Sequence, residues 1–515
     1  PSMGATKNAI PARLARGEPI DVVIMAAGKG TRMKSQRPKV LHTLAGRPLL
    51  GHVLDSAAAL GARSAIVVTG HGAPEVEAFC ADWASAGGRN GTAITPQPVR
   101  QEPQLGTGHA VQQAAPLLPD DGLTLILNGD VPLVRTETMR RLIALCGKDQ
   151  IALLTVDTGD DAGAYGRIVR GAAEGDGDIP VRAIVEAKDA TADQRAITEW
   201  YSGVMAAPTR LLKKYLALLT DDNAQKEFYL TDVVKHAVAD GTPVLALQID
   251  DEVEVAGVNS PVQLAELERE VQQRAARRLM EAGVRLADPA RFDLRGELDC
   301  GQDVEIDVGC IFEGAVTLGD NVRIGAHCVV ANAKIAAGAV IHPFTHIDGG
   351  AQGVVVGPGA LVGPYARLRP GAELGAEVHI GNFVEVKNAR LGPGVKANHL
   401  TYLGDAEVGE RTNIGAGTVT CNYDGVGKHR TVIGAEAFIG SDTMLVAPVK
   451  VGNRAMTGSG SVITQDVPDE ALGLGRARQV TKAGLAKRIM QALRAAKGAL
   501  DPAGVLNPGV LLDPV

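Results

Sequence analysis

The chain has 515 residues, which is too long for one hydrophobic core of ordinary size, so at least two domains are expected. Charged residues make up 22% and hydrophobic residues 45%, as is typical of soluble globular proteins. The formal net charge of −7 argues against a general nucleic-acid-binding protein, because no overall basic excess is available to neutralise phosphates. No run approaches the roughly 18–20 apolar residues of a membrane-spanning helix, so no membrane span is predicted.

The cysteines and the first residues predict a cytoplasmic protein. The six cysteines are far apart and form no C-x-x-C pair, so we expect reduced thiols rather than disulfides or a zinc site. Residues 1–19 contain charges and prolines but lack the apolar stretch of a signal peptide. We expect this opening segment to be disordered.

Alternating strands and helices predict a mostly parallel sheet up to about residue 255. The predicted strands are 21–28, 64–70 and 123–130. The helical pattern between the first two strands ends at Gly61, and strands separated by helices favour right-handed βαβ crossovers. Ligands of such sheets bind at the carboxyl ends of the strands, where residues 28–30 and 128–130 are expected.

Residues 261–282 are predicted to form one long helix. Ser260 is a candidate N-cap, Pro261 suits the first helical position, Gln263 completes a capping box, and Gly283 supplies a stop. The predicted apolar stripe comprises Leu264, Leu267, Val271, Ala275 and Leu279. This segment alone fits a surface helix of the first domain and a rigid connector equally well, and the repeats that follow it favour the connector.

From about residue 300 to 475, glycine recurs with a period of six, usually after an aliphatic residue, as in Ile324–Gly325 and Ile380–Gly381. Such pairs suit a three-sided coil, because the aliphatic side chain fills the interior and the small residue allows a bend at each corner. A stacked solenoid also explains why 62 glycines accompany only 3% aromatic residues. Phase breaks near 341–352 and 420–430 are predicted loops.

The chain after Gly475 contains a predicted basic amphipathic helix at 482–497, followed by a tail rich in proline and glycine. A helix lying on a membrane surface and a solvated helix packed on the domain both fit this pattern. The second is the commoner case, and we adopt it as the expectation.

The segment AAGKGTRMKSQRPK at 26–39 combines glycines with cations directly after the first strand. Gly28 and Gly30 let backbone amides approach phosphate oxygens without a Cβ in the way. The cations of this loop are Lys29, Arg32 and Lys39. Position 33 is Met, so the loop matches neither G-x-G-x-x-G nor a Walker P-loop, yet glycines and cations together predict a phosphate site.

The sequence M-A-A-G-K-G-T-R-M, with Lys39, resembles the signature of sugar-1-phosphate nucleotidyltransferases. The other similar segments are QLGTGHA (104–110), NGDVPL (128–133), AYGRIV (164–169), IVEAKDA (184–190), NAQKEFYLTD (223–232) and EVAGVN (254–259). Together they resemble the bifunctional N-acetylglucosamine-1-phosphate uridylyltransferase/glucosamine-1-phosphate N-acetyltransferase family over roughly residues 20–480. The resemblance implies an α/β Rossmann-like nucleotidyltransferase domain plus a left-handed parallel β-helix (hexapeptide-repeat) domain.

The domain limits that follow from these patterns place the opening segment first and a connecting helix between the two catalytic domains. They are 1–19 for the disordered segment, 20–258 for the uridylyltransferase domain, 259–283 for the linker helix, 284–480 for the β-helix acetyltransferase domain, and 481–515 for the C-terminal helix and tail.

For the first domain, the resemblance implies a UTP and sugar site with Mg²⁺ at Asp130 and Asn259. The residues implied to bind UTP or the UDP-sugar are Ala26, Ala27, Gly28, Lys39, Gln101, Gly106, Thr107, Gly166, Glu186, Tyr201 and Asn259. An Asp that ends a buried strand is a hard oxygen ligand suited to Mg²⁺, although an Asp seen alone there is as often a turn cap. The segment EWYSG places Tyr201 where the family has an Asn that touches the sugar, which leaves the sugar selectivity open.

For the second domain, polar residues that interrupt the aliphatic pattern match the family's acetyltransferase site. The resemblance implies glucosamine-phosphate binding by Arg369, Lys387, Tyr402 and Asn413, and acetyl-CoA binding by Ala416, Asn422, Tyr423, Ser441, Ser459 and Arg476. It implies His399 as the general base. A histidine suits this role because an amine attacking a thioester sheds a proton, which a group with a near-neutral pKa can accept.

The family resemblance implies acetyl transfer from acetyl-CoA to glucosamine-1-phosphate and then uridylyl transfer from UTP to N-acetylglucosamine-1-phosphate. It also implies a homotrimer, and a product that feeds peptidoglycan and lipopolysaccharide. Two alternatives stay open. A nucleotidyltransferase for another sugar would tend to carry a degenerate β-helix, whereas His399, Arg369 and Lys387 are intact here. A non-catalytic assembly subunit would tend to lose the loop cations and Asp130, and these are present.

Overall fold

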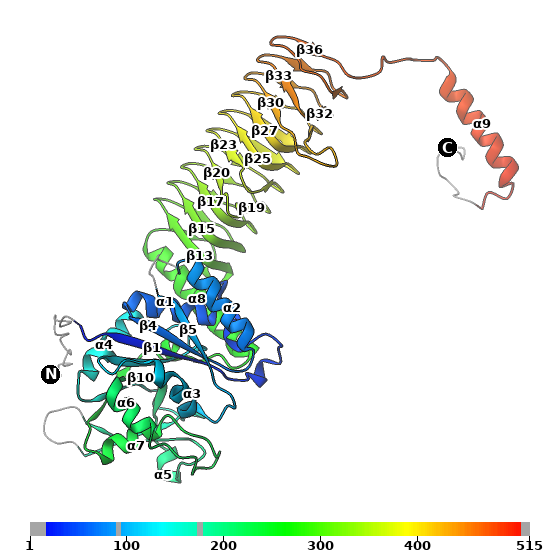
Figure 1. Cartoon of the computed structure of the whole chain (residues 1–515). Coiled ribbons are helices and arrows are strands. Elements are labelled where there is room, and N and C mark those ends of the chain that lie inside the picture. The colour runs from blue at the N-terminus through cyan, green and yellow to red at the C-terminus, as the bar shows by residue number, and fades with distance from the viewer. Residues whose placement is uncertain (1–16, 89–93, 173–178, 506–515) are drawn as a thin grey trace, which may run out of the picture. The chain divides into compact units, whose positions relative to one another are not determined.

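The computed structural model describes residues 17–88, 94–172 and 179–505 and divides the chain into two compact units (Figure 1). The first unit ends at Asn332 and the second begins at Ala333. Most of the opening segment predicted to be disordered, residues 1–16, lies outside the described residues, as do residues 506–515 of the tail.

The first unit contains a mixed sheet in the order β11-β7-β10-β6-β1-β4-β5. Strand β1 pairs in parallel with β4 and β6, whereas β10 runs antiparallel to β6 and β7. The three predicted strands are confirmed as β1, β4 and β6. The strands are β1 (Ile20–Ala26), β4 (Ser64–Thr69), β5 (Pro96–Arg100), β6 (Leu123–Asn128), β7 (Ile151–Asp157), β10 (Glu199–Pro208) and β11 (Val244–Ile249), with the side pair β8 (Arg167–Arg170) and β9 (Val181–Val185).

Helices cover both faces of this sheet because the strands bury apolar side chains on both sides. In β1, Val22 and Ile24 belong to one core, which α1, α2 and α4 cover, and Val23 belongs to the other, which α3, α6 and α7 cover. The helices are α1 (Leu49–Leu60), α2 (Ala73–Ser85), α3 (Thr107–Ala114), α4 (Thr136–Cys146), α5 (Ala192–Arg195), α6 (Thr209–Leu216) and α7 (Asp232–Ala239). The predicted stop after α1 is confirmed, since Gly61 has φ +81°.

The long helix α8 (Pro261–Glu281) begins as predicted, with Ser260 Oγ accepting a hydrogen bond from Gln263 N at 3.2 Å. The capping box is wrong in detail, because Gln263 Oε1 accepts from Asn259 N and not from Ser260 N. The predicted stripe is also incomplete. Gln272 is buried because its side-chain amide pairs with both backbone groups of Leu294, at 2.8 and 2.7 Å.

Helix α8 leads into the first coils of a parallel β-helix, in which β13 pairs in parallel with β15 along its whole length. The strands of these coils within the first unit are β12 (Arg285–Leu286), β13 (Phe292–Cys300), β14 (Glu305–Ile306), β15 (Cys310–Leu318) and β16 (Arg323–Ile324). β17 (Val329–Ile335) spans the boundary between the units.

The second unit is a coil with three faces, on each of which short parallel strands stack on one another (Figure 1), and the strands of the second and third faces belong to one sheet. The first face comprises β18 (Val340–Ile341), β21 (Leu361–Val362), β24 (His379–Asn382), β26 (Lys396–His399), β28 (Asn413–Ile414), β31 (Phe438–Ile439), β34 (Met456–Thr457) and β36 (Leu472–Gly473). The second comprises β19 (His346–Asp348), β22 (Arg367–Leu368), β25 (Glu385–Leu391), β27 (Tyr402–Val408), β29 (Val419–Cys421), β32 (Met444–Val446) and β35 (Val462–Ile463). The third comprises β20 (Val354–Val356), β23 (Glu373–Leu374), the second halves of β25 and β27, β30 (Thr431–Ile433) and β33 (Val449–Val451).

The period-six pattern and the predicted fold class are confirmed, but the repeated glycines have a different role from the one expected. The aliphatic positions form buried columns, as in Ile380, Ala397 and Ile414. A Cβ on Gly415 would lie 2.6 Å from the backbone of Gly440 on the next coil, and Gly415 has no positive φ. These glycines therefore permit close stacking of coils, while many corner residues with positive φ are not glycine.

The two predicted loops differ in outcome. Residues 422–430 leave the coil between β29 and β30, as predicted. The prediction for 341–352 is partly wrong, because β19 lies inside that range and only residues 349–353 form a loop between β19 and β20. The glycine pattern is interrupted there because His342, after Ile341, stands at the position that Gly363 holds after Val362 on the next coil.

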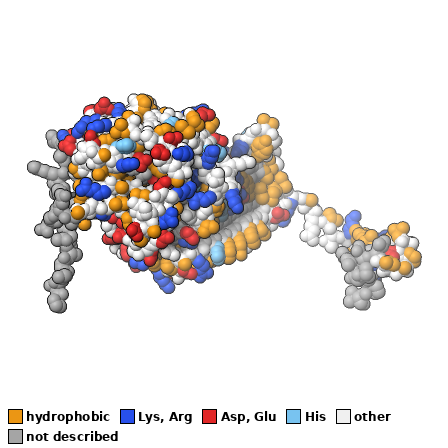
Figure 2. All heavy atoms as spheres, turned by 90° about the horizontal axis from the view of Figure 1, so that it is seen from below, with side chains coloured by type: hydrophobic (Ala, Val, Ile, Leu, Met, Phe, Trp, Pro, Cys, Tyr) orange, Lys and Arg blue, Asp and Glu red, His pale blue; other side chains and the backbone are white. Residues whose placement is uncertain are grey.

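The predicted basic helix is confirmed as α9 (Leu485–Leu500), and its packing on the domain stays a prediction. None of its side chains is buried, and Ile489 and Leu493 are exposed. Figure 2 shows hydrophobic side chains interspersed with charged ones over the visible surface. Among the described residues, no helix combines the length and apolar character needed to cross a membrane.

Candidate functional site

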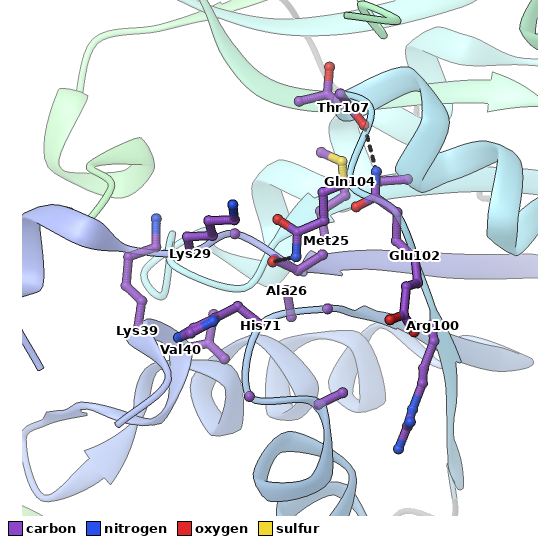
Figure 3. A pocket seen from close by; sticks show the side chains of 18 of the residues that line it. Met25, Ala26, Lys29, Lys39, Val40, His71, Arg100, Glu102, Gln104 and Thr107 are labelled. Carbon is purple, nitrogen blue, oxygen red and sulfur yellow. Dashed lines mark hydrogen bonds between the residues drawn. The ribbon is translucent and has the colours of Figure 1, made fainter. Parts of the chain in front are cut away.

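A cavity of about 930 Å³ opens at the carboxyl ends of β1, β4 and β6, where the sequence predicts the phosphate site (Figure 3). Eight of the predicted residues line it, namely Ala26, Ala27, Gly28, Lys39, Gln101, Gly106, Thr107 and Asp130. Gly166, Glu186, Tyr201 and Asn259 do not line it. The cavity therefore brings the predicted nucleotide residues together and leaves the predicted sugar residues outside its lining.

The two glycines of the loop after β1 have separate roles. A Cβ on Gly28 would meet no protein atom within 4 Å, so the space beside this residue is open to a ligand. Gly30 has φ +57°, and a Cβ there would lie 2.9 Å from Lys39 Cβ. Gly30 therefore allows Lys39 to approach the loop, and Figure 3 shows Lys29 and Lys39 at the same end of the cavity.

Two oxygen atoms from distant segments converge on Lys39. Its Nζ donates to Asp130 Oδ2 at 2.5 Å and to Asn259 Oδ1 at 3.0 Å. Asp130 comes just after β6, and Asn259 comes just before α8. Lys39 therefore joins two segments that are 129 positions apart in the sequence. Within the described part of the chain, no three His, Cys, Asp or Glu side chains form a cluster suited to a metal ion.

The opposite wall of the cavity is built from two of the similar segments, QLGTGHA and NAQKEFYLTD. Gln101 Nε2 donates to Gly106 O at 2.9 Å, and Thr107 Oγ1 accepts from Leu230 N at 3.0 Å. A Cβ on Gly106 would lie 2.7 Å from Phe228 O, so only glycine allows the two segments to meet. The sequence did not identify Gln104, whose Nε2 donates to Ala27 O at 2.7 Å.

Gly166, Glu186 and Tyr201 form a second group in the same unit. Tyr201 N donates to Gly166 O at 2.9 Å, and Glu186 Oε1 accepts from Thr231 Oγ1 at 2.9 Å. Burial raises the pKa of Glu186. Burial, and to a lesser degree Glu186, raises the pKa of Tyr201, whose hydroxyl is buried with no hydrogen-bond partner among the described residues. Thr231 was not identified from the sequence.

In the second unit, three of the four residues predicted to bind glucosamine phosphate, Arg369, Lys387 and Tyr402, lie on or directly after adjacent strands of one face. Glu385 on β25 stands in register with Arg367 on β22 and with Tyr402 on β27. Arg369 Nη1 donates to Glu385 Oε1 at 2.7 Å, which orients the guanidinium group. Asn413 is not part of this cluster, because it lies on β28 of another face, in register with Lys396.

Lys428, which the sequence did not single out, completes this cluster from the loop 422–430. Its proximity lowers the pKa of Lys387, because two ammonium groups repel each other. Asp405 is the nearby carboxylate, and it accepts from Asn388 Nδ2 and Asn422 Nδ2, each at 2.6 Å. Asn422 Nδ2 also donates to Tyr402 Oη at 3.2 Å. This bond joins a residue predicted to bind acetyl-CoA to one predicted to bind the sugar phosphate.

His399 lies at the end of β26, exposed to solvent, in register with Asn382 on β24. Its Nδ1 faces Asn382 Oδ1 at 3.2 Å. A carbonyl oxygen can only accept, so this contact places the proton on Nδ1 and leaves the lone pair on Nε2. The pairing with Asn382 was not predicted.

The remaining predicted acetyl-CoA residues follow His399 along one corner of the coil. Gly417 N donates to His399 O, Asp442 N donates to Ala416 O, and Gly460 N donates to Ser441 O. Arg476 Nη1 donates to Ser459 O at 2.5 Å and closes the row. Ala416, Ser441, Ser459 and Arg476 therefore lie on successive coils, whereas Tyr423 is on the loop and is 62% exposed.

The first unit has a cavity with cations at the edge of an α/β sheet, and the second has a hexapeptide coil with a histidine and a cluster of arginine and lysine side chains. Together these features define a two-domain transferase. The family model for a MobA-like NTP transferase domain matches residues 22–286, and that for the bacterial transferase hexapeptide matches 353–388 and 430–465. The chain is 65% identical to the bifunctional protein GlmU of Polaromonas naphthalenivorans, over 92% of this chain and 98% of the relative. It is 64% identical to the protein of the same name from Paracidovorax citrulli, over 90% and 97%, and 56% identical to that of Cupriavidus taiwanensis, over 90% and 97%. The chain belongs to the GlmU family of bifunctional enzymes.

Proposed function

We propose that the chain synthesises UDP-N-acetylglucosamine in two steps at two separate sites. The second unit transfers an acetyl group from acetyl-CoA to glucosamine-1-phosphate, and the first unit transfers uridylyl from UTP to N-acetylglucosamine-1-phosphate with release of pyrophosphate. The observation that carries this proposal is the presence of both site types in one chain: the glycine-loop cavity at Lys39, and His399 together with the cluster of Arg369, Lys387 and Lys428 in the second unit.

In the uridylyl transfer, the chain's task is to hold and neutralise phosphates, since attack on the α-phosphorus needs alignment more than a covalent intermediate. The open backbone beside Gly28 suits phosphate oxygens, and Lys39 supplies a cation beside it. The wall formed by Gln101 and Thr107 would position the base and ribose.

Mg²⁺ fits the oxygens that face Lys39. Asp130 Oδ2 and Asn259 Oδ1 already converge on one positive group, and carboxylate and amide oxygens are ligands that Mg²⁺ accepts. When bound there together with phosphates, the ion would neutralise triphosphate charge. Lys39 would then turn to the phosphates.

In the acetyl transfer, the sugar amine attacks the thioester carbonyl carbon, the C–S bond breaks, and the amine loses a proton. Nε2 of His399 accepts that proton, because Asn382 holds Nδ1 in its protonated form. Arg369, Lys387 and Lys428 would bind the phosphate of the sugar.

We also propose a cytoplasmic homotrimer. None of the six cysteines, all of which lie in the described part of the chain, forms a disulfide, as expected of a reducing compartment. An exposed apolar ladder (Phe344, Tyr365, Phe383 and Leu400) runs along one corner of the second unit, with ring centroids 5.3 and 5.6 Å apart. Its side chains are 50–62% exposed, and it ends beside His399, so neighbouring copies packed on it would lie next to the acetyl-transfer site.

Product analysis of the purified protein tests the proposal. With glucosamine-1-phosphate, acetyl-CoA, UTP and Mg²⁺, we expect UDP-N-acetylglucosamine together with free CoA and pyrophosphate. Replacement of the amino sugar by glucose-1-phosphate serves as the control and should release no CoA. Failure to form the acetylated nucleotide sugar in folded protein would contradict the proposed function.

A further inference from the structure

The loop 422–430 brings Lys428 near Lys387, although two ammonium groups repel each other. The loop leaves the coil after β29 and returns at β30, and an antiparallel bridge pairs Tyr423 with Lys428. A lysine on an exposed loop would swing away from a second lysine unless the backbone that carries it were fixed. The structure therefore contains something that holds this loop in place.

Asp424 makes the contacts that close the loop. Its Oδ1 accepts from Val426 N at 2.8 Å and from Gly427 N at 2.7 Å, and its own N–H donates to Gly427 O at 3.2 Å. These bonds fold the chain back immediately before Lys428. The pKa of Asp424 lies well below its usual range, chiefly because of the bond from Gly427 N and then because of His429 and Val426 N.

His429 ties the same carboxylate to the returning strand. Its Nε2 lies 2.6 Å from Asp424 Oδ2, and its backbone N donates to Asn422 O at 2.8 Å. Lys428 is thus flanked by a carboxylate that fixes the turn before it and by a histidine anchored after it. Tyr423 Oη donates to Gly425 O at 2.8 Å and braces the tip.

We propose that Asp424 is a positioning residue for the acetyl transfer, which holds Lys428 against Lys387 so that the sugar phosphate meets both ammonium groups. The inference rests on the proposed function of the second unit. Asp424 bonds to Val426, Gly427 and His429 of its own loop and not to His399. It acts through Lys428, by fixing the loop against the repulsion between the two lysines.

Steady-state kinetics of Asp424→Ala in the full-length protein test this inference. We expect the KM for glucosamine-1-phosphate to rise about tenfold or more, as for the loss of one charge-assisted contact, with little change in kcat or in the KM for acetyl-CoA. Asp424→Asn, which keeps an acceptor for the two backbone N–H groups, should recover most of the loss. The matched control is Asp348→Ala, since Asp348 Oδ1 accepts from Gly350 N at 2.9 Å in a loop without a lysine, and this variant should behave as the wild type.

The decisive comparison repeats Asp424→Ala in a Lys428→Ala background. If Asp424 acts only through Lys428, the second substitution should add almost nothing to the first, whereas independent effects that multiply would overturn the inference. A normal KM in folded Asp424→Ala would overturn it too. Pyrophosphate release from N-acetylglucosamine-1-phosphate and UTP reports that each variant is folded. Absence of CoA release in the wild type would refute the proposed function instead, so the two failures are distinguishable.

Discussion

At the scale of single residues, the sequence predicts which side chains gather at the first site better than it predicts their hydrogen-bond and charge partners. Gly28, Lys29 and Lys39 line the cavity, and they could be predicted because glycine and cations directly after a strand are typical of a loop that binds phosphates. Lys428 and Asn382 were missed because their roles depend on partners 41 and 17 positions away, which periodicity does not reveal. The sequence also does not reveal that the hydroxyl of Tyr201 is buried without a hydrogen-bond partner in the described part of the chain.

Tyr201→Phe should stabilise the first unit or leave its stability unchanged. A buried hydroxyl without a partner costs roughly 1–3 kcal/mol of desolvation, and Phe keeps the ring while removing that cost. Tyr201→Asn should instead destabilise by about 2–4 kcal/mol, because it opens a cavity and buries an amide. Thermal unfolding measures both, and a clear loss of stability in Tyr201→Phe would show that the hydroxyl has a partner.

At the scale of helices and strands, local signals predicted the elements and long-range contacts decided their details. The start of α8 at Ser260 and the stop of α1 at Gly61 follow from capping chemistry within a few residues. The burial of Gln272 does not, because its partner Leu294 belongs to β13. The stacking role of Gly415 likewise depends on Gly440, one coil later.

The docking of α8 provides a pH test. Asp251 accepts from Arg274 of α8 at 2.7 and 2.9 Å and is also paired with Arg135, and these contacts, those of Arg274 above all, hold the pKa of Asp251 below its ordinary value. We expect Asp251→Asn to lower the stability of the first unit by about 1 kcal/mol or less at pH 7. Because the pKa is lowered on folding, this difference is present above about pH 3.9 and disappears as the pH falls through the folded-state value.

Urea unfolding of wild type and Asp251→Asn between pH 7 and pH 3 measures this difference. A gap that widened on acidification would contradict the assignment of the ion pair. High salt should also reduce the gap, because Arg274 is 41% exposed.

At the scale of the whole molecule, the two fold classes follow from the change of sequence period, whereas an association surface does not. The apolar ladder arises from residues 17–21 positions apart that share a corner, a spacing that the glycine pattern obscures. The resemblance to known enzymes implied a trimer without indicating these side chains.

Phe383→Glu should weaken association between copies of the chain. The substitution places a charge on an exposed ladder position that copies would bury, and Val262→Glu is the matched control, since Val262 is 66% exposed on α8. Light scattering after size-exclusion chromatography measures the mass. Equal masses for both variants and the wild type would exclude the ladder as the contact surface.

The central claim is that two independent sites act in one chain, and paired single-site variants test it most directly. His399→Ala should abolish CoA release while pyrophosphate release from N-acetylglucosamine-1-phosphate stays intact, and Asp130→Ala should do the reverse. An equal mixture of the two variants should then form UDP-N-acetylglucosamine from glucosamine-1-phosphate, because the acetylated sugar can pass between molecules. If either substitution silenced both reactions in folded protein, or if the mixture formed no product, the account of two separate sites would be wrong.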